Sequence, residues 1–170
     1  MRKISIIYSW FVRTITYFLP NTPFLMRFRG FLYSLMIRNC GRNFQVSSSV
    51  IINSLFHLKI GSNVYIAHNT VIIGHNIQIK DEVIIGPNCV ISSGNHVFDG
   101  NSYRFRPSIS NKVIIGEGSW VAGNCSITAG AILPNKSILA AGAVLNKPFN
   151  QERSIYAGVP AKLIKSIVTS

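Results

Sequence analysis

The sequence predicts an all-β fold, a parallel β-helix, and three observations support it. An aliphatic side chain returns every six residues from Ile115 to Leu145, a small residue lies two positions before each of the later ones, and Gly and Asn recur between these pairs. A period of six fits neither an α-helix nor a simple hairpin, but it is typical of stacked coils that bury one continuous core. The aliphatic positions are Ile115, Val121, Ile127, Leu133, Leu139 and Leu145, and the small ones are Ser119, Cys125, Ala131, Ser137 and Ala143.

Residues 1–43 are predicted to form two short apolar helices that break at residues 19–23, where Pro23 suits a first helical turn. Aromatic and basic side chains alternate along both helices, a composition that suits the headgroup layer of a membrane. The apolar run of residues 4–19 contains Arg13 and is too short to span a bilayer. We therefore expect residues 1–40 to touch a membrane peripherally, or to cap the β-helix or a neighbouring subunit.

The β-helix is predicted over residues 44–148. Its repeat is loose at first, takes a one-residue insertion near Ile73, and stops at Val97 before resuming at Val113. The polar stretch of residues 98–112 has no period, so we expect a loop that leaves the coils and carries functional side chains. Residues 149–170 form a basic C-terminal tail outside the β-helix in this prediction.

The chain of 170 residues has a net charge of +12, because it contains only five acidic residues. This excess indicates attraction to polyanions such as an anionic membrane or a phosphorylated cofactor. No recognised nucleic-acid motif accompanies the charge, so we expect no nucleic-acid partner. The three cysteines form no even pairing scheme, which predicts reduced, mostly buried thiols and a cytoplasmic protein.

Three stretches, residues 114–123, 140–145 and 156–165, resemble the hexapeptide-repeat acyltransferases. The resemblance covers roughly residues 58–167. It is strongest to the maltose and galactoside O-acetyltransferase branch and to the enzymes that modify capsule, colanic acid or lipopolysaccharide. It implies a left-handed coil, a homotrimer with active sites between subunits, and acetyl-CoA as donor with no metal. The N-terminal helices are not shared in this form with the maltose branch.

Within this resemblance, His96 takes the position of the family's catalytic histidine. Imidazole can take the proton from an acceptor hydroxyl as the oxygen attacks a thioester. Asp99 is expected either to orient that imidazole or to cap the turn at Gly100. Asn69 or Asn76 is expected to position the acceptor, and the alternative for each is a plain corner residue.

The resemblance also implies a set of donor-binding residues. Trp120 would border the acetyl-CoA channel, or would be a surface aromatic at a subunit contact. Small residues would let the pantetheine arm approach the backbone, and a polar pair and two terminal lysines would lie near the cofactor, the lysines by its phosphates. These residues are Gly123, Ala141, Gly142, Asn146, Lys147, Lys162 and Lys165.

We therefore predict an acetyl-CoA-dependent O-acetyltransferase that acts on a sugar hydroxyl of a surface polysaccharide or its precursor, at the cytoplasmic face of a membrane. Three alternatives stay open. The acceptor could be a small sugar or an amino sugar. The chain could be a non-catalytic trimeric scaffold that binds membranes. It could also be a zinc enzyme of the γ-carbonic anhydrase kind, although the spacing of His68, His75 and His96 does not match that family.

Overall fold

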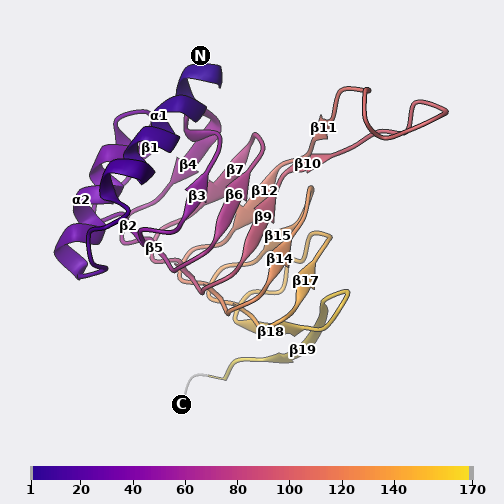
Figure 1. The fold of residues 1–170 in the computed structure, drawn as a ribbon. Coiled ribbons are helices and arrows are strands. Elements are labelled where there is room, and N and C mark those ends of the chain that lie inside the picture. The colour runs from indigo at the N-terminus through magenta and orange to yellow at the C-terminus, as the bar shows by residue number, and fades with distance from the viewer. Residues whose placement is uncertain (1, 169–170) are drawn as a thin grey trace.

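The six-residue repeat closes into triangular coils that stack along one axis as a left-handed parallel β-helix, which confirms the predicted fold (Figure 1). The coordinates are a computed structural model that describes residues 2–168. Five coils each give one strand to each of three parallel sheets, which we name A, B and C in the order in which a coil visits them.

Most strands contain only two or three residues, because each of the three sides of a coil, including its corner, is only six residues long. Sheet A contains β1 (Asn39–Cys40), β4 (Leu58–Ile60), β7 (Ile77–Ile79), β12 (Val113–Ile115) and β15 (Ile132–Leu133). Sheet B contains β2 (Gln45–Val46), β5 (Tyr65–Ile66), β8 (Ile84–Ile85), β13 (Trp120–Val121), β16 (Ile138–Leu139), β18 (Ser154–Ala157) and β19 (Lys162–Ser166). Sheet C contains β3 (Ile51–Ile52), β6 (Val71–Ile73), β9 (Val90–Ser92), β14 (Ser126–Ile127) and β17 (Val144–Leu145).

The core is the column of alternating large and small side chains that the repeat predicts. All six aliphatic positions between Ile115 and Leu145 are buried, as are the small residues two positions before them. The predicted phase was wrong at one point, because Ile72 and not Ile73 points inward. The inserted residue lies in the turn before β7, where Asn76 adopts a left-handed φ of 61°, a conformation that asparagine tolerates.

The cysteines are free thiols. Cys89 and Cys125 are buried in the column, and their Sγ atoms donate to the carbonyls of Ala122 and Ala140, each at 3.1 Å. Cys40 is only half-buried, and burial raises the pKa of its thiol to about 11. All three side chains therefore act as small core or near-core groups.

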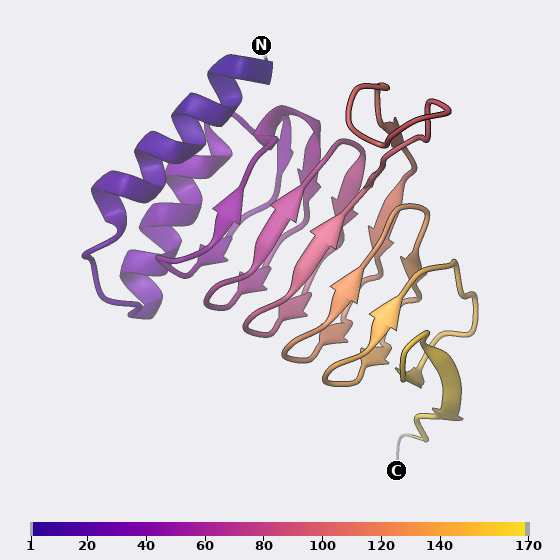
Figure 2. The ribbon, with the colours of Figure 1, turned by 45° about the vertical axis from the view of Figure 1, so that its right-hand side comes forward.

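Helices α1 (Arg2–Thr16) and α2 (Pro23–Ser34) lie across the first coil and close the N-terminal end of the stack (Figures 1 and 2). Helix α1 contacts β3 and the 3₁₀ turn η1 (Leu55–His57), while α2 contacts β2. The predicted pair of helices is confirmed, but the predicted boundary at residue 43 is too late. The first strand, β1, already pairs with β4 at Asn39.

The C-terminal tail of residues 149–170 does not lie wholly outside the β-helix, contrary to the prediction. Strand β18 pairs in parallel with β16 and begins a sixth coil, and β19 then folds back antiparallel on β18. The six-residue period is lost between β17 and β18. Ser154 and Tyr156 of β18 nevertheless keep the two-residue spacing of inward positions, and both are buried. The core therefore continues through Tyr156 to Ala161.

The predicted loop projects from the stack, well clear of the coils (Figures 1 and 2). Two short antiparallel strands, β10 (Gly94–Asn95) and β11 (Ile109–Ser110), form its base. The loop is therefore held at its root on the edge between sheets C and A, and its tip lies outside the β-helix.

Candidate active site

His96 lines a cavity of about 290 Å³ near the N-terminal end of the β-helix. Its wall is built from three successive coils, with Ser54 from the first, His75 from the second and Ser92 from the third, and helix α1 adds Ile6. These coil positions all lie where the chain turns from sheet C to sheet A. The cavity therefore forms where stacked corners meet the root of the loop.

The imidazole of His96 is exposed, and no other side chain or backbone group within residues 2–168 bonds to it. It follows β10 directly, so the antiparallel ribbon at the loop root fixes its backbone. An exposed imidazole at the wall of a small cavity can accept a proton from a bound hydroxyl group without first breaking an internal hydrogen bond.

Asp99 caps the turn at Gly100, which is the second of the two roles that the sequence predicts for it. Its Oδ1 accepts the backbone N–H groups of Asn101 at 2.8 Å and Ser102 at 2.7 Å. These bonds, that of Ser102 first, lower the pKa of the Asp99 carboxyl. The carboxylate therefore shapes the loop, and a role in orienting His96 stays a prediction.

Sequence reasoning considered His75 only as a possible zinc ligand and missed its place beside His96 in the cavity. Its Nδ1 lies 3.4 Å from Ser54 Oγ, and its ring meets the ring of His57 edge to face with centroids 4.6 Å apart. Its carbonyl accepts hydrogen bonds from the hydroxyls of Ser93 and Ser110, at the base of the loop. The insertion near Ile73 is the sequence signal that could have identified it, since the extra residue enlarges this corner.

The two candidate acceptor asparagines lie on different edges. Asn76 is on the same C-to-A edge as His96 and lines a neighbouring cavity of about 360 Å³ beside Arg38 and His75. Asn69 is on the B-to-C edge, where its Nδ2 donates to Asn88 Oδ1 at 3.1 Å. In a single chain only Asn76 lies beside the His96 cavity.

The predicted donor residues also divide between edges. Gly123, Ala141 and Gly142 stack on the B-to-C edge, where the N–H of Gly142 donates to the Gly123 carbonyl at 3.0 Å. A Cβ added at Gly142 would meet nothing within 4 Å, so this corner is open. Trp120 is half exposed on the outer face of sheet B.

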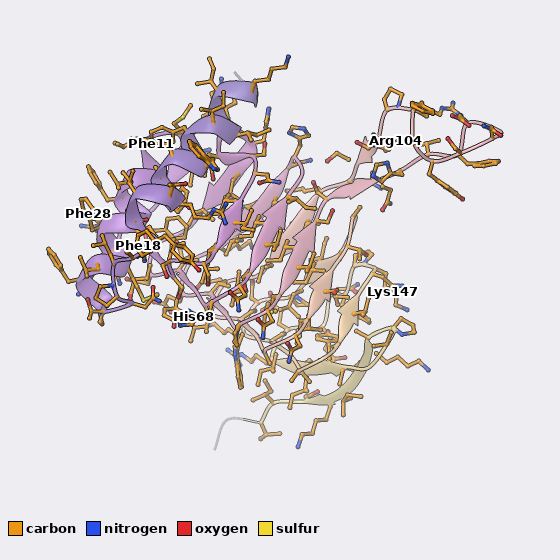
Figure 3. The ribbon with its side chains drawn as sticks, viewed as in Figure 1. Phe11, Phe18, Phe28, His68, Arg104 and Lys147 are labelled. Carbon is orange, nitrogen blue, oxygen red and sulfur yellow. The ribbon has the colours of Figure 1, made fainter. Side chains whose placement is uncertain are left out.

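The remaining donor candidates lie at the C-terminal end of the stack. Asn146 and Lys147 follow β17 on the C-to-A edge, and Lys147 Nζ lies 5.3 Å from the Phe149 ring centroid. Lys162 and Lys165 are exposed on β19. Figure 3 shows Lys147 on the opposite side of the molecule from the helices.

No group of three or more His, Cys, Asp or Glu residues in the described part of the chain is arranged to hold a metal ion. His68 lies on the B-to-C edge and His75 and His96 on the C-to-A edge, so the three histidines do not converge within one chain. Neither helix in residues 2–168 has the length and apolar content needed to cross a bilayer.

The chain was compared with known proteins, and no family model matches it. A protein of Saccharomyces cerevisiae described as an acetyltransferase is 31% identical over 133 residues, which cover 78% of this chain and 67% of that protein. The galactoside O-acetyltransferase of Escherichia coli is 26% identical over 157 residues, covering 91% of this chain and 77% of the enzyme.

A solved structure agrees with the sequence relatives. The hexapeptide-repeat acetyltransferase of Vibrio cholerae in complex with acetyl coenzyme A superposes with a TM-score of 0.84 over 98% of this chain and 89% of that one. At 20% identity this match shows the shared fold. Together with the stacked hexapeptide coils, these similarities establish that the chain belongs to the hexapeptide-repeat acetyltransferase family.

Proposed function

We propose that this acetyltransferase moves the acetyl group of acetyl-CoA to a hydroxyl of a sugar in a surface polysaccharide or its precursor, with His96 as general base and the protein held at a membrane surface. The observation that carries the proposal is the exposed His96 imidazole on the wall of a small cavity that also presents serine and asparagine side chains. The imidazole takes the hydroxyl proton while the oxygen attacks the thioester carbonyl. The tetrahedral intermediate then expels CoA as its thiolate, which receives the proton from the imidazolium.

The lining of the cavity supports a sugar acceptor. Asn53, Ser54, Ser92 and Ser108 provide amide and hydroxyl groups that can both donate and accept hydrogen bonds. The volume of about 290 Å³ is at the lower end of small-molecule sites, which favours one small ring at a time. The galactoside O-acetyltransferase among the relatives is named for a sugar acceptor.

The predicted donor glycines and the proposed base His96 lie on different edges of the β-helix, which supports an active site shared between subunits. Gly123 and Gly142 lie on the B-to-C edge and His96 on the C-to-A edge, with sheet C between them. A neighbouring copy that brings its B-to-C edge to this His96 would complete the site. Cyclic packing of this kind needs two different contact surfaces on every subunit.

Two outer faces of the β-helix could provide these surfaces in a homotrimer. The register places Tyr65, Ile84 and Trp120 in one outward row on sheet B. It places Val71 and Val90 in an outward row on sheet C. The outward row of sheet A is polar over the first three coils, with Asn39, Lys59 and Gln78, and becomes apolar only at Ile114 and Ile132. Sheets B and C are therefore the better faces to bury.

We predict that sedimentation equilibrium gives three times the mass of the chain, and that Ile84→Lys lowers the trimer fraction at least about tenfold by burying an unpaired charge. The matched control is Gln78→Lys on sheet A, which should stay trimeric. A monomeric wild-type protein, or an Ile84→Lys variant that stays trimeric, would contradict this assembly.

Binding of acetyl-CoA tests the donor half of the proposal. Isothermal titration should give about one site per chain, and a Lys162→Ala/Lys165→Ala variant should bind about tenfold more weakly, because two phosphate contacts are removed. An Arg27→Ala/Lys59→Ala variant loses the same charge elsewhere and should bind as the wild type does. Failure to bind at millimolar acetyl-CoA would instead favour the scaffold alternative.

A further inference from the structure

We propose that the outer face of helices α1 and α2 is a docking surface for an anionic lipid bilayer, and that it holds the His96 cavity at the bilayer surface. The polarity of α1 is the first reason. Over residues 3–16 its buried face consists of Ser5, Ser9, Val12 and Thr16, so three of these four buried positions are polar. A helix packed on a protein core normally buries its apolar side.

The polar inner face is bonded to the first coil. Ser5 Oγ accepts the backbone N–H of Leu55 at 3.0 Å, and the Ser9 hydroxyl donates to the Ile52 carbonyl. These bonds fix the rotation of α1 about its axis. The apolar side of the helix must therefore face away from the coils.

The outer face of both helices is apolar and aromatic. Apolar side chains along α1, α2 and the turn between them are exposed, and the most exposed are Phe18 in that turn at 89% and Phe24 in α2 at 73%. The docking face consists of Ile4, Ile7, Trp10, Phe11, Ile15, Phe18, Phe24, Phe28, Phe31 and Leu35. Figure 3 shows Phe11, Phe18 and Phe28 together at the helical end of the molecule. Patches this rich in large apolar groups mark sites of protein or membrane contact.

The basic residues near the docking face favour an anionic membrane as its partner over a second copy of the chain. Lys3, Arg13 and Arg27 lie on the two helices, and no acidic residue occurs before Asp81. Basic residues beside an apolar helical face are attracted to anionic headgroups. A second copy of the same face would bring like charges together, and their repulsion would oppose the contact. The helices are too short to cross a bilayer, so they would lie along its surface.

The position of the face connects it to the active site. Ile6 lines the His96 cavity and belongs to the same turn of α1 as Ile4 and Ile7 of the docking face. The cavity is built on the first three coils, which are nearest to the helices. A bilayer on this face would therefore lie beside the cavity. Resting on the proposed transfer to a sugar, this arrangement points to an acceptor carried on a membrane lipid.

Co-sedimentation of the full chain with vesicles of phosphatidylcholine and phosphatidylglycerol tests the docking face. The wild type should bind these vesicles, bind phosphatidylcholine vesicles less, and be released by added salt. The variant Phe11→Ser/Phe18→Ser/Phe28→Ser should partition at least about tenfold less. All three side chains are exposed, so its circular dichroism melting curve should match that of the wild type.

The matched control is Val159→Ser/Leu163→Ser/Ile164→Ser, which removes three exposed apolar side chains from the C-terminal hairpin. Its partition should equal that of the wild type. Two results overturn the docking face: no binding of the wild type to the anionic vesicles, or equal binding of the helix variant. A higher oligomer of the wild type that the helix variant loses would assign the face to a second copy instead.

Fluorescence tests where the cavity lies. An environment-sensitive dye on Asn53→Cys, at the cavity wall, should shift to shorter wavelength with anionic vesicles, while a dye on Asn150→Cys should not. Both are made with Cys40→Ser, since Cys89 and Cys125 are buried. An unchanged Asn53 signal on bound protein would overturn the cavity placement. Neither experiment uses acetyl-CoA or an acceptor, so its failure is separate from a failure of the proposed transfer.

Discussion

Replacing His96 by alanine is expected to lower kcat for acetyl transfer to a sugar at least about a hundredfold, because positioned proton transfer contributes 10² to 10⁴ in rate. No other side chain or backbone group within residues 2–168 bonds to the imidazole, so its removal should leave the fold intact. Binding of acetyl-CoA, measured by titration, should persist. The rate is followed as release of the CoA thiol with a galactoside acceptor.

The matched control is Arg42→Ala. This side chain is also exposed, but it lies on the A-to-B edge, which carries neither the His96 cavity nor the predicted donor glycines, and its loss should change kcat by less than about twofold. A His96→Ala enzyme with the wild-type kcat would remove the assigned base. A His75→Ala variant with the larger loss would transfer the role to His75.

Replacing Arg29 by alanine is expected to lower the free energy of unfolding by about 3–5 kcal/mol, because a buried, fully bonded charge leaves its partners unsatisfied when it is removed. Arg29 is completely buried, and burial lowers the pKa of its guanidinium. Nη1 donates to the carbonyl of Val46 at 2.6 Å, and Nη2 donates to the carbonyls of Thr16 at 3.0 Å and Leu19 at 3.2 Å.

These bonds explain why the effect should be large. The Thr16 carbonyl lies at the end of α1, where it also accepts the N–H of Leu19 at 3.1 Å, and the Leu19 carbonyl lies in the turn that follows the helix. Carbonyls at a helix end lack the helical N–H groups that satisfy those in its interior. Val46 is in β2, the edge strand of sheet B at the N-terminal end of the stack, and an uncovered edge carries unpaired carbonyls. The guanidinium of Arg29 in α2 therefore donates to carbonyls at and just after the end of α1 and to a carbonyl of the first coil, and it links both helices to that coil.

Urea unfolding at one protein concentration measures this effect. Arg29→Lys should be intermediate, because an ammonium group cannot reproduce the planar set of donors. Arg27→Ala, on the exposed side of the same helix, should change stability by no more than about 0.5 kcal/mol. Equal losses for Arg27→Ala and Arg29→Ala would contradict the role of the buried guanidinium.

The coils could be predicted because their signal is local. Alternation of inward and outward side chains has a period of two, and each sheet of a coil adds a corner, so the six-residue period is visible in the sequence itself. Strands β1 and β18 escaped prediction because they consist of few residues and are defined by pairing with β4 and β16, from another coil. The error at Ile72 has the same cause, because the pairing of β6 with β9 in the next coil decides which residue points inward.

The site was predicted only in part. His96 stands out in sequence because the repeat stops beside it, but the rest of its cavity comes from corners about twenty residues apart, which only the stacking of coils brings together. His75 and Ser54 belong to this group. The apolar face of α1 was predicted as a composition, whereas the direction in which it points depends on the hydrogen bonds of Ser5 and Ser9.

Product analysis tests the central claim most directly. The wild-type protein and His96→Ala would each be incubated with acetyl-CoA and a panel of hexopyranosides, and the products identified by mass spectrometry and alkali treatment. We predict an alkali-labile O-acetyl sugar with the wild type and almost none with the variant. Equal product from both proteins, or none from a wild type that binds acetyl-CoA, would contradict the assignment of His96 as the base of a sugar O-acetyltransferase.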